Sequence, residues 1–375
     1  MDKKIAIIGA SYLQLPLVKK AKEMGLYSIC FAWAEGAVCK DVADKFYPIS
    51  IVEKEQILAI CQKEQIDGIC TIASDVAAPT VAYVAEKMGL VGNGYECALR
   101  ANNKYLMRQA LSKADVPCPK YWYVNEENFK HQTLNISHFT FPLIVKPSDR
   151  SGSLGVSKAE NLEDLLPAIK AAQSYSFKHE AMVEQFIEGR EISVEFISYN
   201  GVHYPLQITD KVTTEAPRFV ELEHHQPADF TKAQYADIYE QTKRALTALG
   251  ITNGASHSEY RITNDGKIYV MEIGARMGGD FIGSDLVQLS TGYDFLRGVI
   301  EVALGMFTSP HLTEHNYSGV YFLSEATAYL KPIIKQQALP EIVRAEITDT
   351  ELHSLTCSGD RSGYLIYKSD KKLVL

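Results

Sequence analysis

The chain has 375 residues, of which 46% are hydrophobic and 22% are charged, and its formal net charge at pH 7 is −8. This length suits two or three domains better than one core. The acidic balance provides no chain-wide basic surface for nucleic acid, and the longest apolar runs, 5–8 and 29–34, are far too short to cross a bilayer. We therefore expect neither a membrane protein nor a nucleic-acid-binding protein.

The N-terminus, MDKKIAIIGA, runs straight into an apolar strand and lacks the pattern of a secretory signal. The seven cysteines are scattered without a CxxC pair, so neither a disulfide framework nor a zinc site is indicated. Both observations predict a cytoplasmic protein.

The first hundred residues alternate strand and helix patterns. Strands are expected at 4–8, 27–32 and 68–72, and helices at 13–24, 55–65 and 79–88. This alternation predicts a Rossmann-like domain with a parallel sheet covered on both faces. Ser11, Gln14 and Asp75 follow strand ends, where such sheets bind ligands, although loop capping also explains them. The first loop lacks the second glycine of GxGxxG, so a nicotinamide-dependent oxidoreductase is only weakly indicated.

A lysine followed by a glycine-serine loop occurs after the short strand 143–146. Lys146 leads into PSDRSGSLGV, residues 147–156. The backbone N–H groups of such a loop can close over phosphate oxygens while the lysine ammonium neutralises them. An ordinary surface loop is the alternative explanation of the same residues.

The segment AMVEQFIEGREISVEF predicts strands at 181–186 and 191–199 around a turn at Glu188-Gly189. In the second strand, apolar residues alternate with Glu191, Ser193 and Glu195, which we expect to point outward. Exposed backbone between the two strands offers the donor and acceptor edge that adenine needs, and a nearby carboxylate can bind ribose hydroxyls. An ordinary hairpin with a solvated acidic face is the alternative.

The mixed-polarity segment 211–227 predicts a functional loop over a site. Its His224-His225 pair lacks the companion Cys or His spacing of a metal site. Helices are expected at 233–249 and 285–304, and residues 311–375 predict a small accessory subdomain of short strands.

The stretch YVMEIGARMGGDFIG, residues 269–283, is expected to pair with SHSEYRI, residues 256–262, in an antiparallel hairpin. The intervening Asn264-Asp265-Gly266 is the strongest short-range hairpin signal in the chain. A turn centred on its last two residues places Glu259 opposite Glu272, and it places His257 opposite Gly274.

Like charges that face each other across a ladder are destabilising unless a pKa rises or a cation is supplied. Mg²⁺ is held by one or two carboxylates plus substrate phosphates, so the pair Glu259 and Glu272 predicts a nucleotide site. The alternative is a solvated sheet face whose glutamates splay into water, because a one-residue slip in register would separate them.

The order of these motifs resembles the ATP-grasp superfamily of ligases over nearly the whole chain. The motifs are, in order, Asn103-Lys104, Lys146 with its glycine loop, 184–189, Glu259, Glu272 and Arg276. The resemblance implies an α/β and α+β architecture, in which a Rossmann-like parallel-sheet domain (1–100) precedes an ATP-grasp fold of two α+β subdomains (101–310). These subdomains are a central part, 101–180, and a nucleotide- and metal-binding part, 181–310, and a small C-terminal subdomain, 311–375, follows.

The resemblance also implies a role for each matching position. Those that touch the ATP phosphates are Lys104, Lys146 and the loop residues Ser151, Gly152, Ser153 and Gly155. Those that hold adenine and ribose are Glu184, Gln185, Phe186, Ile187 and, for the ribose, Glu191. Glu259 and Glu272 bind Mg²⁺, with Mn²⁺ as an alternative ion. Arg276 and Lys146 act in catalysis by stabilising charge on the acyl phosphate and the transferred phosphoryl group.

One position departs from the family pattern. The family usually carries asparagine as a third metal ligand two residues after the second metal glutamate, where this chain has Gly274. The number of metal ions is therefore open.

The segments HSEYRI, MEIGARMGGDFIG and FVELEHHQP resemble those of the ATP-grasp branch that joins a carboxylate to an amine, which includes L-amino-acid ligases. This implies an ATP-dependent ligase that forms an amide or peptide bond through an acyl phosphate and releases ADP and phosphate. Its partners would be a small-molecule carboxylate and an amine, and family analogy implies a homodimer. Candidate substrate-contacting residues are Lys211, Glu221, His257 and Gly278, while Asp280 and His224 could set specificity.

Two other functions stay open. Within the superfamily, the alternative is a purine-biosynthesis or carbamoyl-phosphate-type enzyme. From another class, a non-catalytic Mg-ATP-binding regulator is conceivable, because Gly274 removes one expected metal ligand.

Overall fold

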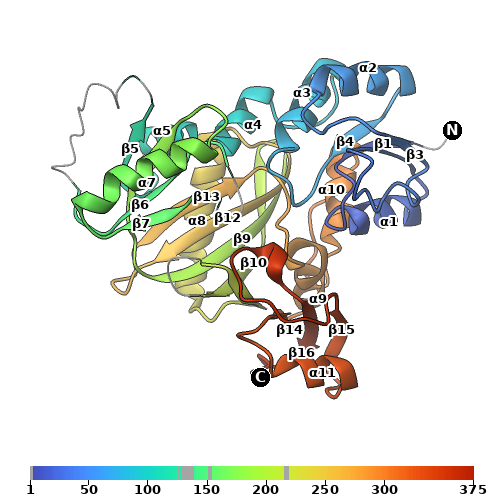
Figure 1. Cartoon of the computed structure of the whole chain (residues 1–375). Coiled ribbons are helices and arrows are strands. Elements are labelled where there is room, and N and C mark those ends of the chain that lie inside the picture. The colour runs from blue at the N-terminus through green and yellow to red at the C-terminus, as the bar shows by residue number, and fades with distance from the viewer. Residues whose placement is uncertain (1–2, 126, 128–138, 151–153, 215–218) are drawn as a thin grey trace.

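The computed structural model describes residues 3–125, 127, 139–150, 154–214 and 219–375. Within them the chain forms a four-stranded parallel sheet, a four-stranded antiparallel sheet and an eight-stranded antiparallel sheet. Figure 1 shows the parallel sheet on the right, the small antiparallel sheet at the upper left and the large sheet between them, with the C-terminal strands below. In this described part of the chain, no helix combines the length and apolarity needed to span a membrane.

The N-terminal parallel sheet has the strand order β3-β2-β1-β4. Its elements are β1 (Lys4–Ile8), α1 (Leu15–Glu23), β2 (Tyr27–Phe31), β3 (Lys45–Tyr47), α2 (Lys54–Glu64), β4 (Gly68–Cys70) and α3 (Ala78–Met88). The predicted parallel sheet is confirmed. The strand expected at 68–72 ends early, because Ile72 leaves the ladder and forms a parallel bridge to Met277, beside the predicted site.

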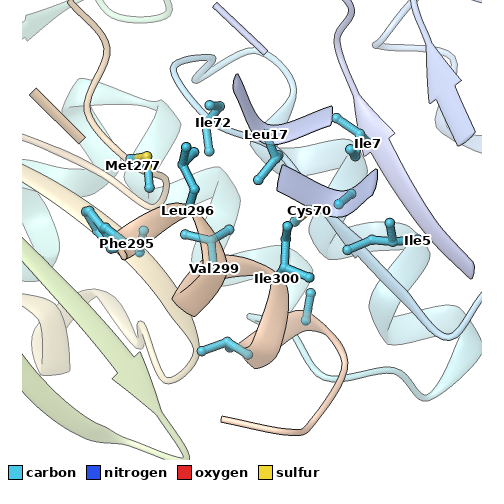
Figure 2. Packing of buried hydrophobic residues seen from close by; sticks show 14 of the residues in the cluster. Ile5, Ile7, Leu17, Cys70, Ile72, Met277, Phe295, Leu296, Val299 and Ile300 are labelled. Atoms are coloured by element: carbon cyan, nitrogen blue, oxygen red, sulfur yellow. The ribbon is translucent and has the colours of Figure 1, made fainter. Parts of the chain in front are cut away.

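One face of this sheet shares its core with a helix from far along the chain. Ile5, Ile7 and Cys70 share a buried cluster with Val299 and Ile300 of helix α10 (Phe295–Ala303). Figure 2 shows these side chains gathered in one cluster, with Ile72 and Met277 on the side away from Ile5. The N-terminal sheet is therefore fixed against the rest of the chain by apolar burial, the dominant favourable term in folding.

The small antiparallel sheet has the order β5-β8-β6-β7. The elements of this region are α4 (Tyr95–Asn102), α5 (Lys104–Lys113), β5 (Tyr121–Val124), β6 (Leu143–Pro147), β7 (Ser157–Ala159), α7 (Leu162–Tyr175) and β8 (Ala181–Gln185). The side chain of Asn103 accepts a hydrogen bond from Leu106 N and caps α5. This cap fixes the start of the helix that carries Lys104.

The large sheet has the order β13-β12-β9-β10-β11-β14-β16-β15. The elements of its first half are β9 (Arg190–Tyr199), β10 (Val202–Thr213), β11 (Glu221–Gln226), α8 (Lys232–Leu249), β12 (Gly254–Ile262) and β13 (Ile268–Gly274). The functional loop expected at 211–227 is instead largely made of paired strand, since β10 and β11 pair from Asp210 to His225. Ser193 and Glu195, expected to point outward, are fully buried because both faces of β9 are covered.

The C-terminal strands continue this same sheet through the pairing of β11 with β14. The remaining elements are η1 (Ile282–Leu286, a π-helical turn), α9 (Val287–Thr291), α10, β14 (Tyr317–Leu323), α11 (Leu330–Gln336), β15 (Ile342–Ile347), η2 (Ser358–Asp360) and β16 (Gly363–Ser369). The single helix expected at 285–304 is wrong. Gly292, with φ of +76°, ends α9, and Asp294 then caps α10.

The β12–β13 hairpin has the predicted facing residues but a different turn. Thr263 and Lys267 close a three-residue loop, 264–266, so the expected two-residue turn is wrong. A bulge at Met271 adds one residue to β13 and compensates, so that Glu259 pairs with Glu272 and His257 with Gly274. The bulge also lets Val270 and Ile273 both enter the core.

Candidate active site

A pocket of about 250 Å³ lies between the small antiparallel sheet and the β12–β13 hairpin. The sequence-predicted residues that line it are Lys104, Lys146, Glu184, Gln185, Phe186, Ile187, Glu191, Lys211, Glu221, His257, Glu259, Glu272 and Arg276. Gly155 lies between two lining residues, Leu154 and Val156. Gly278 is not among the residues that line the pocket. Ser151, Gly152 and Ser153 fall outside the described residues. Two sheets and segments more than 150 residues apart thus converge on one site.

The facing carboxylates are neutralised by two lysines. Lys211 Nζ lies 2.7 Å from Glu259 Oε1, and Lys104 Nζ lies 3.2 Å from Glu272 Oε1. Burial disfavours the charged carboxylate of Glu259, but Lys211 and His257 outweigh burial and hold the pKa of Glu259 well below its usual range. Both acids therefore face the pocket, and the prediction that they share one face is confirmed.

The donor set fits a Mg²⁺ ion that shares its coordination with a nucleotide. Glu259 and Glu272 supply carboxylate oxygens from one face, as Mg²⁺ sites with substrate phosphates require. Within the described part of the chain, no group of three or more His, Cys, Asp or Glu side chains forms a protein-only cage. Two carboxylates leave several coordination positions to phosphate oxygens and water.

The space beside Gly274 is already taken. A Cβ at this position would lie 2.8 Å from Asp75 Oδ1 and 3.0 Å from Arg276 Cζ. An asparagine at position 274 would have to displace this Asp75–Arg276 pair. The departure from the family pattern therefore has a steric reason.

A buried ion-pair triad holds the phosphate-side lysine. Glu184 is 1% exposed, with Arg108 Nε 2.9 Å from Oε1 and Lys146 Nζ 2.7 Å from Oε2. Burial lowers the pKa of Lys146, and Arg108 and Lys104 lower it further against the pull of Glu184. Neither Glu184 oxygen has an aligned hydrogen bond within the described residues, so both keep the capacity to accept one from a ligand.

Replacing Glu184 with glutamine is expected to destabilise the fold by about 3–5 kcal/mol, because it leaves two buried cations without a counter-charge. Urea unfolding measures this loss. The matched control is Glu160→Gln, which removes a surface pair with Lys158 at 2.8 Å and should cost about 0–1 kcal/mol. Similar losses in both variants would show that the buried triad has no special role.

The segment after β8 presents backbone to the pocket. The side chain of Gln185 bonds back to Thr140, with Nε2 donating to the Thr140 carbonyl at 2.7 Å, so Gln185 offers the pocket its backbone. The peptide of Ile187 makes no backbone hydrogen bond to any described residue. Beyond it, Glu191 is held by Arg261 at 2.6 Å and by Lys211 at 3.2 Å.

Arg276 joins the N-terminal sheet to the hairpin. Its Nη2 donates to Asp75 Oδ2 at 2.7 Å, and its buried Nε has no hydrogen-bond partner among the described residues. Burial raises the pKa of Asp75, but Arg276 outweighs burial and keeps that pKa below its usual value. The guanidinium therefore lies in the pocket wall with donor capacity to spare.

His257 lies between two carboxylates. Its Nδ1 makes a short contact with the fully buried Glu195, and its Nε2 lies 3.4 Å from Glu259 Oε1. Glu195 outweighs the effect of burial and raises the pKa of His257 to about 9. Gly278 N donates to Glu195 at 3.2 Å, and a Cβ at Gly278 would lie 2.7 Å from the His257 ring. Glu195 and Gly278 thus fix the position of the His257 ring beside Glu259.

Residues 139–285 match the ATP-grasp domain family. The chain contains an ATP-grasp domain. The matched range ends just past Arg276 and includes strands β6 to β13, among them the hairpin that carries both pocket carboxylates.

Several relatives of this ATP-grasp domain are ligases by name. The chain is 29% identical over 250 residues to the alanine–anticapsin ligase of Bacillus subtilis (strain 168), an alignment that covers 58% of this chain and 52% of that protein. Among solved structures, the L-amino acid ligase from Bacillus licheniformis has a TM-score of 0.80 at 22% identity, covering 99% of this chain and 94% of that one. Phosphoribosylglycinamide synthetase from Anaerococcus prevotii has a TM-score of 0.77 at 21% identity, covering 99% and 95%.

These structural likenesses show the ATP-grasp fold alone. The chain spans about half the length of the curated relatives it matches.

Two residues of the ATP-grasp site were missed or misread from the sequence. Arg108 was not considered, although it lies one helical turn after Lys104, where side chains share a face. Glu195 was placed on an outward face, yet it stands four residues after Glu191 on the same strand face. Asp75 was correctly placed at a strand end, while Ser11 and Gln14 cap the loop, since Gln14 Oε1 accepts from Ser11 Oγ at 2.8 Å.

Proposed function

We propose that this chain is an ATP-dependent carboxylate–amine ligase, which forms an amide or peptide bond through an acyl phosphate and releases ADP and phosphate. The observation that carries the proposal is the pairing of Glu259 with Glu272 across one hairpin, in a pocket that also contains Lys146 and Arg276. A facing pair of acids and several cations in one cavity suit a Mg-nucleotide better than any uncharged ligand. The sequence relationship to an alanine–anticapsin ligase supports the carboxylate–amine branch.

The pocket offers a separate group to each part of ATP. Glu184 and the peptide of Ile187, which has no backbone hydrogen bond to a described residue, lie where adenine would find an acceptor and a backbone edge. Glu191 faces the ribose. Lys104 and Lys146 face the phosphates, with Lys104 Nζ also donating to the Arg150 carbonyl at 2.6 Å, just before the glycine loop.

The proposed reaction has two steps. A carboxylate oxygen of the first substrate attacks the γ-phosphorus of ATP, and the bond from that phosphorus to the β,γ-bridging oxygen breaks to release ADP. The nitrogen of the second substrate then attacks the acyl carbon, phosphate leaves and the amine gives up a proton. Mg²⁺, held by Glu259 and Glu272, or Mn²⁺ in its place, would supply charge neutralisation at the phosphates.

The residues of the chain act by position and charge. Lys146 neutralises the transferred phosphoryl group, and Arg276 stabilises negative charge on the acyl phosphate and on the oxyanion that forms at the acyl carbon. His257, fixed by Glu195, holds Glu259 in place. Lys211 and Glu221 border both the nucleotide and the substrate side of the pocket.

Two alternatives make different predictions. A purine-biosynthesis enzyme shares this fold, as the phosphoribosylglycinamide synthetase structure shows for that protein, and it would require a phosphorylated amine. A non-catalytic regulator is consistent with Gly274 in place of a third metal ligand. The regulator would bind Mg-ATP without any substrate-stimulated ADP formation.

A substrate-pair screen tests the proposal. The protein, labelled ATP and Mg²⁺ are incubated with panels of carboxylates and amines, including amino acids, bicarbonate and phosphoribosylamine, and ADP and phosphate are measured. We expect release of both products, with a new C–N bond, only when a carboxylate and an amine are present together. Product release only when phosphoribosylamine is the amine would favour the purine-biosynthesis alternative, and no release with any pair although Mg-ATP binds would favour the regulator; either result would contradict the proposal.

A homodimer and a cytoplasmic location stay predictions. All seven cysteines are free thiols and five of them are buried, which supports a reducing compartment.

A further inference from the structure

A second pocket, of about 180 Å³, continues from the nucleotide pocket. The two pockets share Lys211, Glu221, His257, Glu259 and Arg276, so they meet where the acyl phosphate would form. Beyond this junction, the second pocket is lined by His224 of β11, by Asp280 in the loop after β13, and by Cys357 and Ser358 near η2. Residues from the C-terminal region therefore close the side of the site away from the nucleotide.

His224 lies in the wall of this second pocket with unused polar atoms. Its side chain is 1% exposed, and neither ring nitrogen has a hydrogen-bond partner among the described residues. Nε2 lies 3.8 Å from Asp280 Oδ2, too far for a direct hydrogen bond. Burial lowers the pKa of His224 despite the opposing charge of Asp280, so the ring is neutral and one nitrogen can accept a hydrogen bond.

Asp280 is fixed in position by Arg361. Arg361 Nη1 lies 2.8 Å from Asp280 Oδ2, while its Nη2 lies 3.0 Å from Glu221, and the guanidinium stacks 3.7 Å from the Phe322 ring centroid. One guanidinium thus serves two carboxylates, and Glu221 also lies 3.6 Å from Lys211 Nζ, whereas Asp280 has Arg361 as its one cationic partner among the described residues. Asp280 and Phe281 also have positive φ values, 50° and 65°, which are uncommon for residues other than glycine. Such backbone persists where the surroundings dictate it, and here it turns Asp280 toward the pocket.

We propose that His224 and Asp280 together bind a primary ammonium group, so that the carboxylate substrate of this enzyme is an amino acid. A nitrogen about 2.8–3.0 Å from both His224 Nε2 and Asp280 Oδ2 fits the 3.8 Å gap between them. An ammonium has three donors and can serve a neutral imidazole and a carboxylate at once, whereas an anion in this gap would be repelled by the Asp280 carboxylate. The inference rests on the proposed ligase function, because it takes the reacting carboxylate to lie near Arg276.

The test compares amino acids with the same carboxylates lacking the amino group, such as alanine with propionate and phenylalanine with 3-phenylpropionate. We expect kcat/KM for ADP formation to favour the amino form by about 10–100-fold, the usual effect of a charge-assisted hydrogen bond. In Asp280→Asn and in His224→Gln this preference should fall to within a few-fold. The matched control, Asp285→Asn, removes an aspartate paired with Arg344 at 2.8 Å on the same segment and should keep the preference. Retained Mg-ATP binding shows that each variant is folded.

The possible results separate the inference from the proposed function. If propionate and alanine work equally well, the ligase stands and the ammonium site is wrong. If no carboxylate of either kind triggers ADP formation, iodoacetamide labelling of Cys357 replaces turnover, since this pocket residue is the exposed one of the seven thiols. Protection by alanine but not by propionate, lost in Asp280→Asn, then supports the ammonium site. Equal protection by both, or protection by neither, overturns it.

Discussion

Arg276→Ala is expected to lower kcat by a factor on the order of 10²–10³, the usual effect of removing one donor to developing negative charge. Arg276 lines both the nucleotide pocket and the substrate pocket. Its Nε has no hydrogen-bond partner among the described residues. Binding of Mg-ATP should persist, because Lys104, Lys146 and the adenine side are separate from Arg276. Steady-state ADP release and calorimetric titration with a non-hydrolysable ATP analogue measure the two effects.

The ion pair with Asp75 provides the control for this experiment. Asp75→Asn breaks the same 2.7 Å contact but keeps the guanidinium in the pocket. If Arg276 acts on the reacting groups, Asp75→Asn should lose far less activity than Arg276→Ala. If Arg276 only ties the N-terminal sheet to the hairpin, both variants lose activity and stability to the same extent, and the catalytic role is wrong.

The double variant Glu259→Gln/Glu272→Gln is expected to lose turnover entirely and to weaken Mg²⁺-dependent nucleotide binding by about 100-fold or more, beyond the effect typical of residues that merely support a ligand. Each substitution keeps the side-chain shape and removes only the charge. Asp265→Asn, at the exposed tip of the same hairpin, removes a surface acid paired with Lys267 and serves as the matched control. It should leave both turnover and metal-dependent binding unchanged.

The single variants distinguish metal binding from lysine anchoring. Glu259 neutralises Lys211, but Lys211 keeps Glu191 and Glu221 when Glu259 is changed. If the glutamates serve the metal, raising Mg²⁺ should partly restore Glu259→Gln. No response to metal concentration would indicate that Glu259 acts only through Lys211.

The sequence predicted the facing residues of the hairpin correctly, but it did not predict the turn or the bulge. Asn264-Asp265-Gly266 marked the turn, and alternation marked the strands, because both signals are local. The bulge at Met271 could not be predicted from the sequence, since it depends on packing. Arg108 Nη2, 163 residues earlier in the chain, donates to the Met271 carbonyl at 2.7 Å. Two errors of register, at the turn and at the bulge, cancelled each other at Glu259 and Glu272.

Burial explains most of the features that could not be predicted from the sequence. In β9, polar and acidic residues alternate with apolar ones, which predicts a solvated acidic face. Glu195 is nevertheless buried, because the loop carrying Gly278 covers it. The continuous helix expected at 285–304 ignored Gly292, whose backbone conformation ends a helix. The shared core of the N-terminal sheet and α10 joins residues some 290 positions apart, and no local pattern encodes such a contact.

The most direct test of the central claim is titration of Mn²⁺, a spectroscopic probe for the Mg²⁺ site, into the protein with and without a non-hydrolysable ATP analogue, monitored by electron paramagnetic resonance. The structure offers two carboxylates and leaves the other coordination positions to phosphate and water. We therefore expect weak Mn²⁺ binding to the protein alone, tight binding when the nucleotide is present, and loss of the tight site in Glu259→Gln/Glu272→Gln. Tight ternary binding that survives in that double variant would contradict the account.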